Sequence, residues 1–294
     1  MPVHRLRFHG TGNVTKYIDL NQALSLVARR MKRQMKNVTV YGGYYVDSGG
    51  SRIDLNVAPD NWVTTTAIKR GFRIWKRMIS ETLKKTDGTG TGKYNDFKVY
   101  LDGAMDTSSN VLLPVDANNG ALYTSTLPEW DYSTLTSEDP DGPVPNANQF
   151  ELHIVGAHAG SPHAWTRLGL MKSWFNSRPE PQFNTPTDIQ DVNDPLSNLF
   201  DAGDSDDDRL TIISAEGDQA PYDEDSHFGI VASGTGQQNL QRVSTAFTTS
   251  SNAQMNIHGF KAICGLVQLV TTGLSDGSDE WELVLDVEET GESF

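Results

Sequence analysis

The chain has little cysteine and no long apolar run. Cys264 is the one cysteine in 294 residues, which excludes an internal disulfide framework and a cysteine-based zinc cluster. No stretch approaches the roughly 20 apolar residues that cross a bilayer, and the opening sequence MPVHRLRFHG lacks the apolar block of a signal peptide. We therefore expect a soluble protein, made in a cytoplasm and stabilised by packing.

Known catalytic motifs are missing as well. The sequence contains no G-x-S-x-G, no H-E-x-x-H, no P-loop and no G-x-G-x-x-G that leads into a helix. Cys264 lies in the apolar run KAICGLV, which favours a buried side chain over a nucleophile. We expect no enzyme and no cofactor. Paired carboxylates among the 38 Asp and Glu leave a hydrolase as an open alternative.

Charge is distributed unevenly along the chain. The net charge is −14, yet residues 1–100 hold 18 of the 24 Lys and Arg against only 7 Asp and Glu. Residues 101–294 hold the other 6 basic residues and 31 acidic ones. A basic end of this kind is typical of contact with nucleic acid, anionic lipid or an acidic partner. We expect the basic third and the acidic remainder to occupy opposite sides of the molecule.

Two basic amphipathic helices are predicted in the first third. In residues 19–36, apolar side chains recur at helical spacing and Asp19 followed by Gln22 forms an N-cap signature. A second apolar stripe with a cationic opposite face predicts a helix over residues 64–85. The cationic face of the first helix fits a membrane surface or phosphates, or is simply solvated. The candidate membrane- or genome-facing residues of the first helix are Arg29, Arg30, Lys32, Arg33 and Lys36.

The rest of the chain reads as short strands and long polar loops. No regular alternation of strands and helices is present, which argues against a parallel α/β architecture. We predict an all-β fold with a few helices, a sandwich or barrel. The twelve predicted strands are residues 38–46, 52–57, 97–101, 111–115, 121–125, 151–155, 210–214, 229–232, 242–247, 254–262, 266–271 and 281–287.

Two clusters of candidate metal ligands stand in the second half. Asp204, Asp206 and Asp208 supply candidate calcium ligands, although they lack the residue order of an EF-hand loop and also fit a solvated acidic loop. His153, His158 and His163 follow one another at five-residue intervals, on a strand and a Gly/Pro turn. That spacing does not bring three imidazoles to one side, so no firm metal site is predicted.

Together, the basic N-terminal helix, the β-rich sequence, the basic helix between strands and the long polar loops resemble a jelly-roll major capsid protein of a small icosahedral virus. The length is most similar to the compact double jelly-roll capsid proteins of membrane-containing phages, including the single-stranded DNA, lipid-containing type. A double jelly roll is favoured over a single jelly roll with long insertions, although twelve predicted strands fall short of the sixteen that two barrels need.

The resemblance implies a self-assembling shell protein of a virion, built of homotrimeric capsomers that contact other capsid proteins. Its basic N-terminal face would meet an internal lipid membrane or the viral genome. The implied divisions are residues 1–36, a basic arm and helix; 37–150, a first barrel with the inserted helix; and 151–294, a second barrel with acidic loops. A spike or carbohydrate-binding β-sandwich stays open, with Trp130, Tyr132, Trp165 and Trp174 as stacking surfaces.

Overall fold

The structure is a computed structural model of the 294-residue chain. It describes residues 3–47, 50–85, 92–105, 110–120, 129–138, 147–161, 164–177, 240–274 and 277–293.

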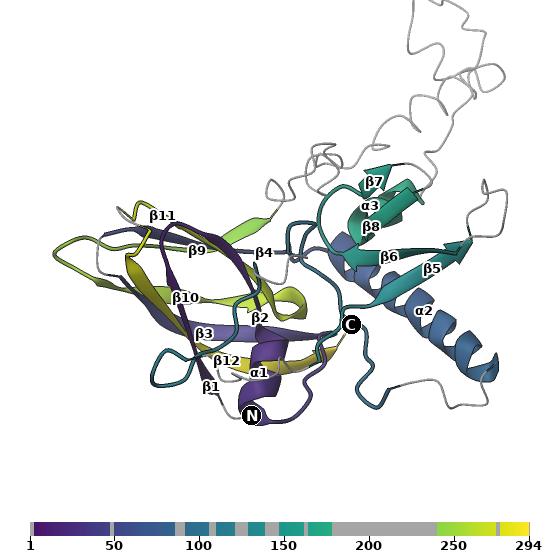
Figure 1. Ribbon diagram of the computed structural model, residues 1–294, viewed down its shortest axis with the longest axis horizontal. Coiled ribbons are helices and arrows are strands. Elements are labelled where there is room, and N and C mark those ends of the chain that lie inside the picture. Colours follow the sequence, from purple (N-terminus) through teal and green to yellow (C-terminus); the bar gives the residue numbers. More distant parts are fainter. Residues whose placement is uncertain are drawn as a thin grey trace, which may run out of the picture.

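Eight strands form two four-stranded antiparallel sheets that face each other (Figure 1). The first sheet has the order β1-β12-β3-β10 and contains β1 (His4–Thr11), β12 (Glu280–Ser293), β3 (Lys36–Asp47) and β10 (Gln254–Ala262). The second has the order β2-β11-β4-β9 and contains β2 (Thr15–Asp19), β11 (Leu266–Thr272), β4 (Arg52–Val57) and β9 (Gln241–Phe247). Strands from the two ends of the chain therefore alternate within each sheet.

The space between the two sheets is an apolar core. Leu6 and Phe8 of β1 are fully buried and lie opposite Leu285 and Leu283 of β12. Successive side chains of a strand point to opposite faces, so the polar residues between them lie on the outer face. Burying each such side chain contributes about 1.5–3 kcal/mol. The same core includes Ile18 of β2, Tyr45 of β3, Ile53 and Leu55 of β4, Ala246 of β9, Ile257 of β10 and Leu269 of β11.

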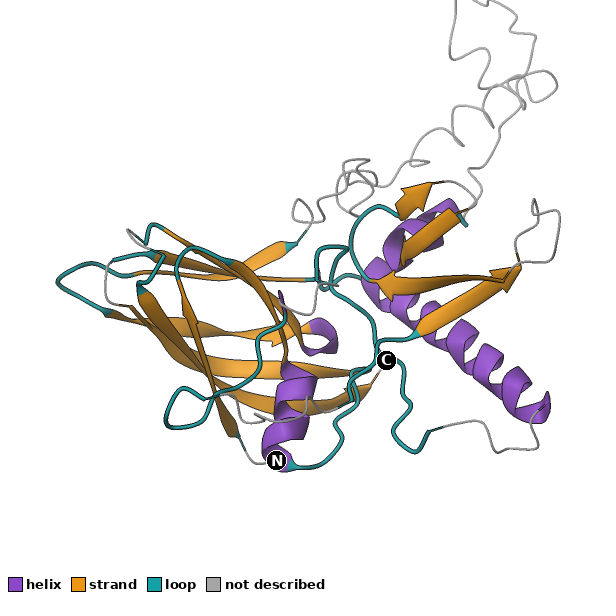
Figure 2. Ribbon diagram, in the orientation of Figure 1, coloured by secondary structure: helices purple, strands orange, loops and turns teal. Residues whose placement is uncertain are grey.

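A long insertion separates β4 from β9. It holds α2 (Trp62–Lys85), α3 (Leu170–Asn176) and a third sheet of order β5-β6-β8-β7, in which β6 and β8 are parallel (Figure 2). These strands are β5 (Thr134–Glu138), β6 (Ala147–His153), β7 (Ala159–Ser161) and β8 (Ala164–Gly169). Ile68 and Trp75 of α2 share one buried cluster with Tyr17 of β2 and Ile263 of the short helix η3 (Ile263–Gly265). The insertion is thus packed on the sandwich.

Asp19 joins the sandwich, α1 (Leu20–Ala28) and the insertion. Its Oδ1 atom accepts the backbone N–H groups of Asn21 and Gln22 at 3.0 and 3.1 Å, which is the predicted N-cap. Its Oδ2 atom accepts hydrogen bonds from Gln34 Nε2 and Trp130 Nε1, each at 3.0 Å. Burial raises the pKa of this carboxyl group to about 6, although the four hydrogen bonds oppose the shift.

An all-β fold with a few helices is confirmed, and so are several predicted elements. Predicted strands 52–57 and 254–262 match β4 and β10, and α2 matches the predicted second helix to within two residues. Residues 97–101 and 111–115 instead form extended segments with isolated bridges. Residues 4–19, expected to be part of a basic arm, form β1 and β2. Predicted strands 121–125, 210–214 and 229–232 lie outside the described residues.

The predicted division into two barrels at residue 150 is wrong. β10 and β12, from the expected second barrel, pair with β3, from the expected first. The residues expected to form an N-terminal arm supply β1 and β2, one to each sheet of the same sandwich. Hydrogen bonding between strands from the two ends of the chain builds one sandwich, whereas two barrels were expected.

None of the helices in the described part of the chain is both long enough and apolar enough to span a membrane.

Candidate functional site

The first predicted basic helix is shorter than expected, which moves its cations off the helix. α1 ends at Ala28, and Arg29 takes a left-handed conformation with φ 49° and ψ 37°. The backbone N–H groups of Arg29 and Arg30 both donate to the carbonyl oxygen of Ser25, which closes the helix. The prediction of a helix through Lys36 is therefore wrong, and all five candidate cations lie beyond the helix, in the turn and at the start of β3.

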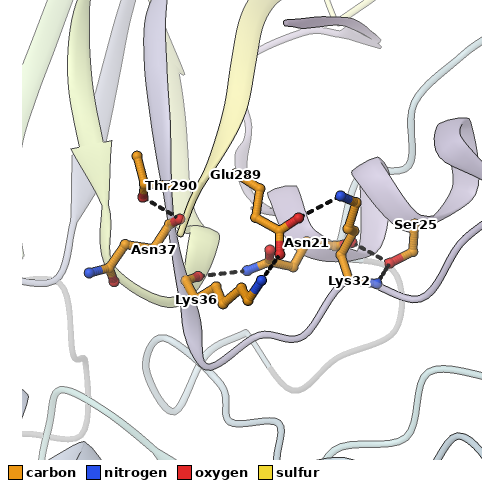
Figure 3. A network of polar contacts seen from close by, with 7 residues as sticks. All are labelled: Asn21, Ser25, Lys32, Lys36, Asn37, Glu289 and Thr290. Carbon is orange, nitrogen blue, oxygen red and sulfur yellow. Dashed lines mark hydrogen bonds and ion pairs between the residues drawn. The ribbon is translucent and has the colours of Figure 1, made fainter. Parts of the chain in front are cut away.

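Ser25 shapes this turn. Its hydroxyl donates to the carbonyl oxygen of Asn21 at 2.7 Å and accepts the backbone N–H of Lys32 at 2.8 Å. Asn21 Nδ2 donates in turn to the carbonyl oxygens of Lys36 and Cys264, at 3.2 and 2.9 Å. Figure 3 shows the contacts of Ser25 with Asn21 and Lys32, and that of Asn21 with Lys36 at the start of β3. The loop that carries the cations is thus anchored to α1.

Lys32 and Lys36 converge on one carboxylate, Glu289 of β12 (Figure 3). The Lys32 Nζ atom lies 2.5 Å from Oε2 and the Lys36 Nζ atom 2.8 Å from Oε1. The side chain of Glu289 is only 9% exposed. Burial alone raises the pKa of Glu289, but the hydrogen bonds from both ammonium groups outweigh it, so this pKa lies below its ordinary value.

A pocket of about 450 Å³ opens at this cluster. It is lined by Arg30, Met31, Lys32, Arg33, Lys36 and Glu289. Four cations against one carboxylate leave the pocket positive, which suits a phosphate or carboxylate ligand.

The five candidate cations differ in whether a carboxylate already pairs with them. Glu289 already holds Lys32 and Lys36, and the exposed Arg33 lies 3.9 Å from Asp96, at the limit of an ion pair. Arg29 and Arg30 are exposed, and no carboxylate of the described residues pairs with either. We call Arg29, Arg30, Lys32, Arg33 and Lys36 the turn cluster.

The expected separation of charge onto opposite sides is wrong at the first sheet. Arg5 and Arg7 of β1 form ion pairs with Asp286 and Glu282 of β12, at 2.7 and 2.6 Å. The cause is the sheet order, because β1 from the basic end is hydrogen-bonded along its length to β12 from the acidic end. In the described part of the chain, α2 carries six exposed cations, of which only Arg77 forms an ion pair, with Glu81. The sequence predicted this cationic side, but it was not among the candidate site residues.

Among the described residues, the other candidates do not assemble into a site. His153 is fully buried with Nε2 at 3.1 Å from the carbonyl oxygen of Ala157, and burial lowers its pKa to about 4. His158 Nδ1 accepts the backbone N–H of Gly169. No three metal-ligating side chains gather anywhere in the described part of the chain. His163 and the candidate calcium ligands Asp204, Asp206 and Asp208 lie outside the described residues.

The aromatic residues considered for glycan stacking are engaged in packing. Trp174 is buried with its ring edge against Trp62, and Tyr132 stacks on Tyr100 at 3.9 Å between ring centroids. Trp130 faces the Lys98 ammonium group, and Trp165 lies against His158. These four rings do not form one open platform. Cys264 is buried as expected, and burial raises the pKa of its thiol.

Searches of protein-family models, curated protein sequences and solved structures found no match to this chain.

Proposed function

We propose that this chain is a structural shell protein, a capsid subunit that self-assembles around a genome, and that its sandwich is a single jelly roll with a long insertion. A jelly roll is a double-sheet, eight-stranded fold found in viral capsids, lectins and cupins. The double jelly roll favoured by the sequence is not part of this proposal, because β9 to β12 pair with β1 to β4.

The nested strand pairing carries the proposal. A jelly roll arises when a long antiparallel hairpin of eight strands is rolled up, so that the first strand pairs with the last, the second with the last but one, and so on inward. The eight sandwich strands follow this rule: β1 pairs with β12, β2 with β11, β3 with β10 and β4 with β9. Rolling then joins β12 to β3 and β11 to β4.

The position of the insertion also supports a single jelly roll. Residues 58–240 enter between β4 and β9, at the tip of the hairpin, where the chain can be extended without breaking any pair. A shell subunit needs lateral surfaces for contacts with its copies beyond the sandwich itself, and an insertion of this size supplies them.

Function still has to be argued from surfaces, because one fold serves many functions. The pocket at the turn cluster is lined by four cations, and the candidate stacking rings are packed, so neither feature supports the glycan-binding alternative. A positive pocket on an acidic chain fits a subunit that meets an anionic interior, either genome or lipid headgroups.

Static light scattering coupled to gel filtration tests this proposal. The full chain is run over a wide concentration range, in low and in high salt. We expect assembly beyond the monomer that grows with concentration and is retained after nuclease treatment. A chain that elutes as a monomer under every condition overturns the proposal.

A further inference from the structure

The exposed side of α2 is a continuous cationic face. Its buried side includes Val63, Ala67, Ile68 and Trp75. On the other side six exposed cations follow one another, within about one third of the helix circumference at 3.6 residues per turn. These are Lys69, Arg70, Arg73, Lys76, Arg77 and Lys84, and we call them the α2 cationic face.

Few negative charges oppose this face. Glu81 is the one acidic residue in the helix, and it pairs with Arg77 across one turn at 2.9 Å. That pair is highly exposed and holds Arg77 weakly. In the described part of the chain, no other cation of the face forms an ion pair. The six cations of the face are therefore opposed by a single carboxylate of the helix.

We propose that the α2 cationic face binds the phosphate backbone of nucleic acid. At a rise of 1.5 Å per residue the face runs for roughly 22 Å from Lys69 to Lys84, a linear array that matches a linear polyanion. The face carries no exposed aromatic ring between these two ends, so stacking on bases is not part of the contact. Binding is therefore expected to be insensitive to base sequence.

A membrane surface fits the same helix less well. A helix that lies in a lipid interface must bury an apolar face in the headgroup region. The apolar stripe of α2 is already used: Ile68 and Trp75 are packed in the protein core, and Gly71 lies close against Leu170 of α3. Trp62 and Ile74 are the large apolar side chains of α2 that are exposed, and they lie three turns apart.

The α2 cationic face is also better suited than the turn cluster. Two of the five cations of the turn cluster, Lys32 and Lys36, are held by the nearly buried Glu289. A phosphate that binds there must compete with a carboxylate that is already in place. On α2 the exposed Glu81 competes for Arg77, and the other five cations of the face form no ion pair with the described residues.

Fluorescence anisotropy with a labelled single-stranded DNA of about 20 nucleotides tests the proposal, since single-strand sites span ~4–16 nucleotides. The test variant combines Lys69→Gln, Arg73→Gln and Lys76→Gln, because Gln has nearly the helix propensity of Lys and Arg. The control combines Arg5→Gln, Lys93→Gln and Arg242→Gln. These three exposed cations lie outside α2: Arg5 is on β1, Lys93 is in a turn, and Arg242 is on β9. Both variants change the net charge equally, and circular dichroism checks that both are folded.

The salt dependence of binding sets the size of the effects that we expect. Each neutralised phosphate contributes about −0.7 to the slope of log K against log salt for a single strand, so six contacts give about −4. The test variant should bind at least tenfold more weakly in low salt, with a slope near −2, whereas the control keeps the wild-type slope. A variant with Lys69→Arg, Arg73→Lys and Lys76→Arg keeps the charge and should bind as the wild type does.

Three results overturn the proposal: no DNA binding by the wild type in low salt, equal losses in the test and control variants, or binding of anionic lipid vesicles that depends on α2 while DNA binding does not. Double-stranded DNA of the same length, measured in parallel, shows whether the face binds the single-stranded or the double-stranded backbone more tightly. The binding assay uses dilute protein and needs no assembly. A negative binding result would therefore overturn the proposal for α2 alone. The shell proposal is tested independently, because light scattering measures self-assembly in the absence of nucleic acid.

Discussion

Lys32 and Glu289 are separated by 257 residues in the sequence, yet Lys32 Nζ lies 2.5 Å from Glu289 Oε2. The nested pairing of strands causes this meeting, because β12 runs beside β3 and brings its C-terminal half to the turn after α1. The ion pair therefore joins the two ends of the chain at the cationic pocket. It ties the shape of that pocket to the closure of the sandwich.

Replacing Glu289 with Gln should destabilise the protein by about 2 kcal/mol, because two ammonium groups lose a nearly buried charged partner. Urea unfolding measures the loss. The matched control is Glu280→Gln, whose side chain is 69% exposed and 3.7 Å from His9, and a change below about 0.5 kcal/mol is expected there. Equal effects of the two substitutions would mean that the Glu289 contacts carry no stability.

The stability of Glu289→Gln should also depend on pH differently from that of the wild type. The pKa of Glu289 is lowered in the folded state from an ordinary value of 4.5, so its stabilisation is present above pH 4.5 and is lost as the pH falls through the lowered value. Wild-type protein should lose more stability on acidification than Glu289→Gln, and the two curves should converge at low pH. Curves that stay parallel would contradict the assignment.

Replacing Arg29 with Gly should stabilise the protein. The left-handed conformation at φ 49° strains any residue that carries a Cβ atom, and glycine avoids this strain. Arg29→Ala is the comparison, because it removes the same charge and keeps the Cβ atom. We expect Arg29→Gly to be about 1 kcal/mol more stable than Arg29→Ala in thermal unfolding. A lower melting temperature for the glycine variant would show that this conformation costs nothing.

Tyr17 connects the sandwich to the insertion through a buried network. Its hydroxyl donates to Asp102 Oδ2 at 2.9 Å and accepts from Gln268 Nε2 at 2.9 Å. Tyr17→Phe leaves both groups short of a partner and should cost about 2 kcal/mol. Tyr94→Phe removes a hydroxyl from a side chain that is 63% exposed and should leave the unfolding midpoint in place. The prediction fails if the two variants unfold together.

His153 should make the insertion sensitive to acid. The pKa of His153 is lowered from 6.5 to about 4, chiefly by burial and also by the neighbouring His158 and Arg167, while the backbone of Ala157 and Gly156 opposes the shift. The folded state therefore favours the neutral ring. This stability is present above pH 6.5 and is lost as the pH falls toward 4.

The free energy of unfolding of wild type and of His153→Gln, measured over this pH range, isolates the effect of His153. Relative to the variant, the wild type should lose up to about 3 kcal/mol on acidification. A constant difference between the two would show that His153 stays unprotonated in both states, or titrates alike in both.

Local sequence patterns predicted the elements whose periodicity is strong. β12 shows alternation of apolar and polar residues from Trp281 to Val287, broken only at Val284, and α2 shows an apolar stripe with cations opposite. The same alternation is present in β1, where Leu6 and Phe8 stand between Arg5 and Arg7. The basic composition of residues 1–36 favoured an arm, but this alternation by itself predicts a strand.

Other features had no local signal. α1 ends at a left-handed arginine where neither Gly nor Pro marks the end, and Met31 and Met35 continue the apolar spacing. Residues 97–101 look like a strand, but the amide of Gln34 binds both the N–H and the carbonyl group of Val99. Contacts between distant residues, such as Lys32 with Glu289, depend on strand order, which one sequence does not reveal.

Electron microscopy of the purified full chain at high concentration tests the shell assignment most directly. The proposal of a shell protein predicts closed particles of uniform diameter, with or without bound nucleic acid. A field of single, unassociated molecules at every concentration and salt condition would contradict it.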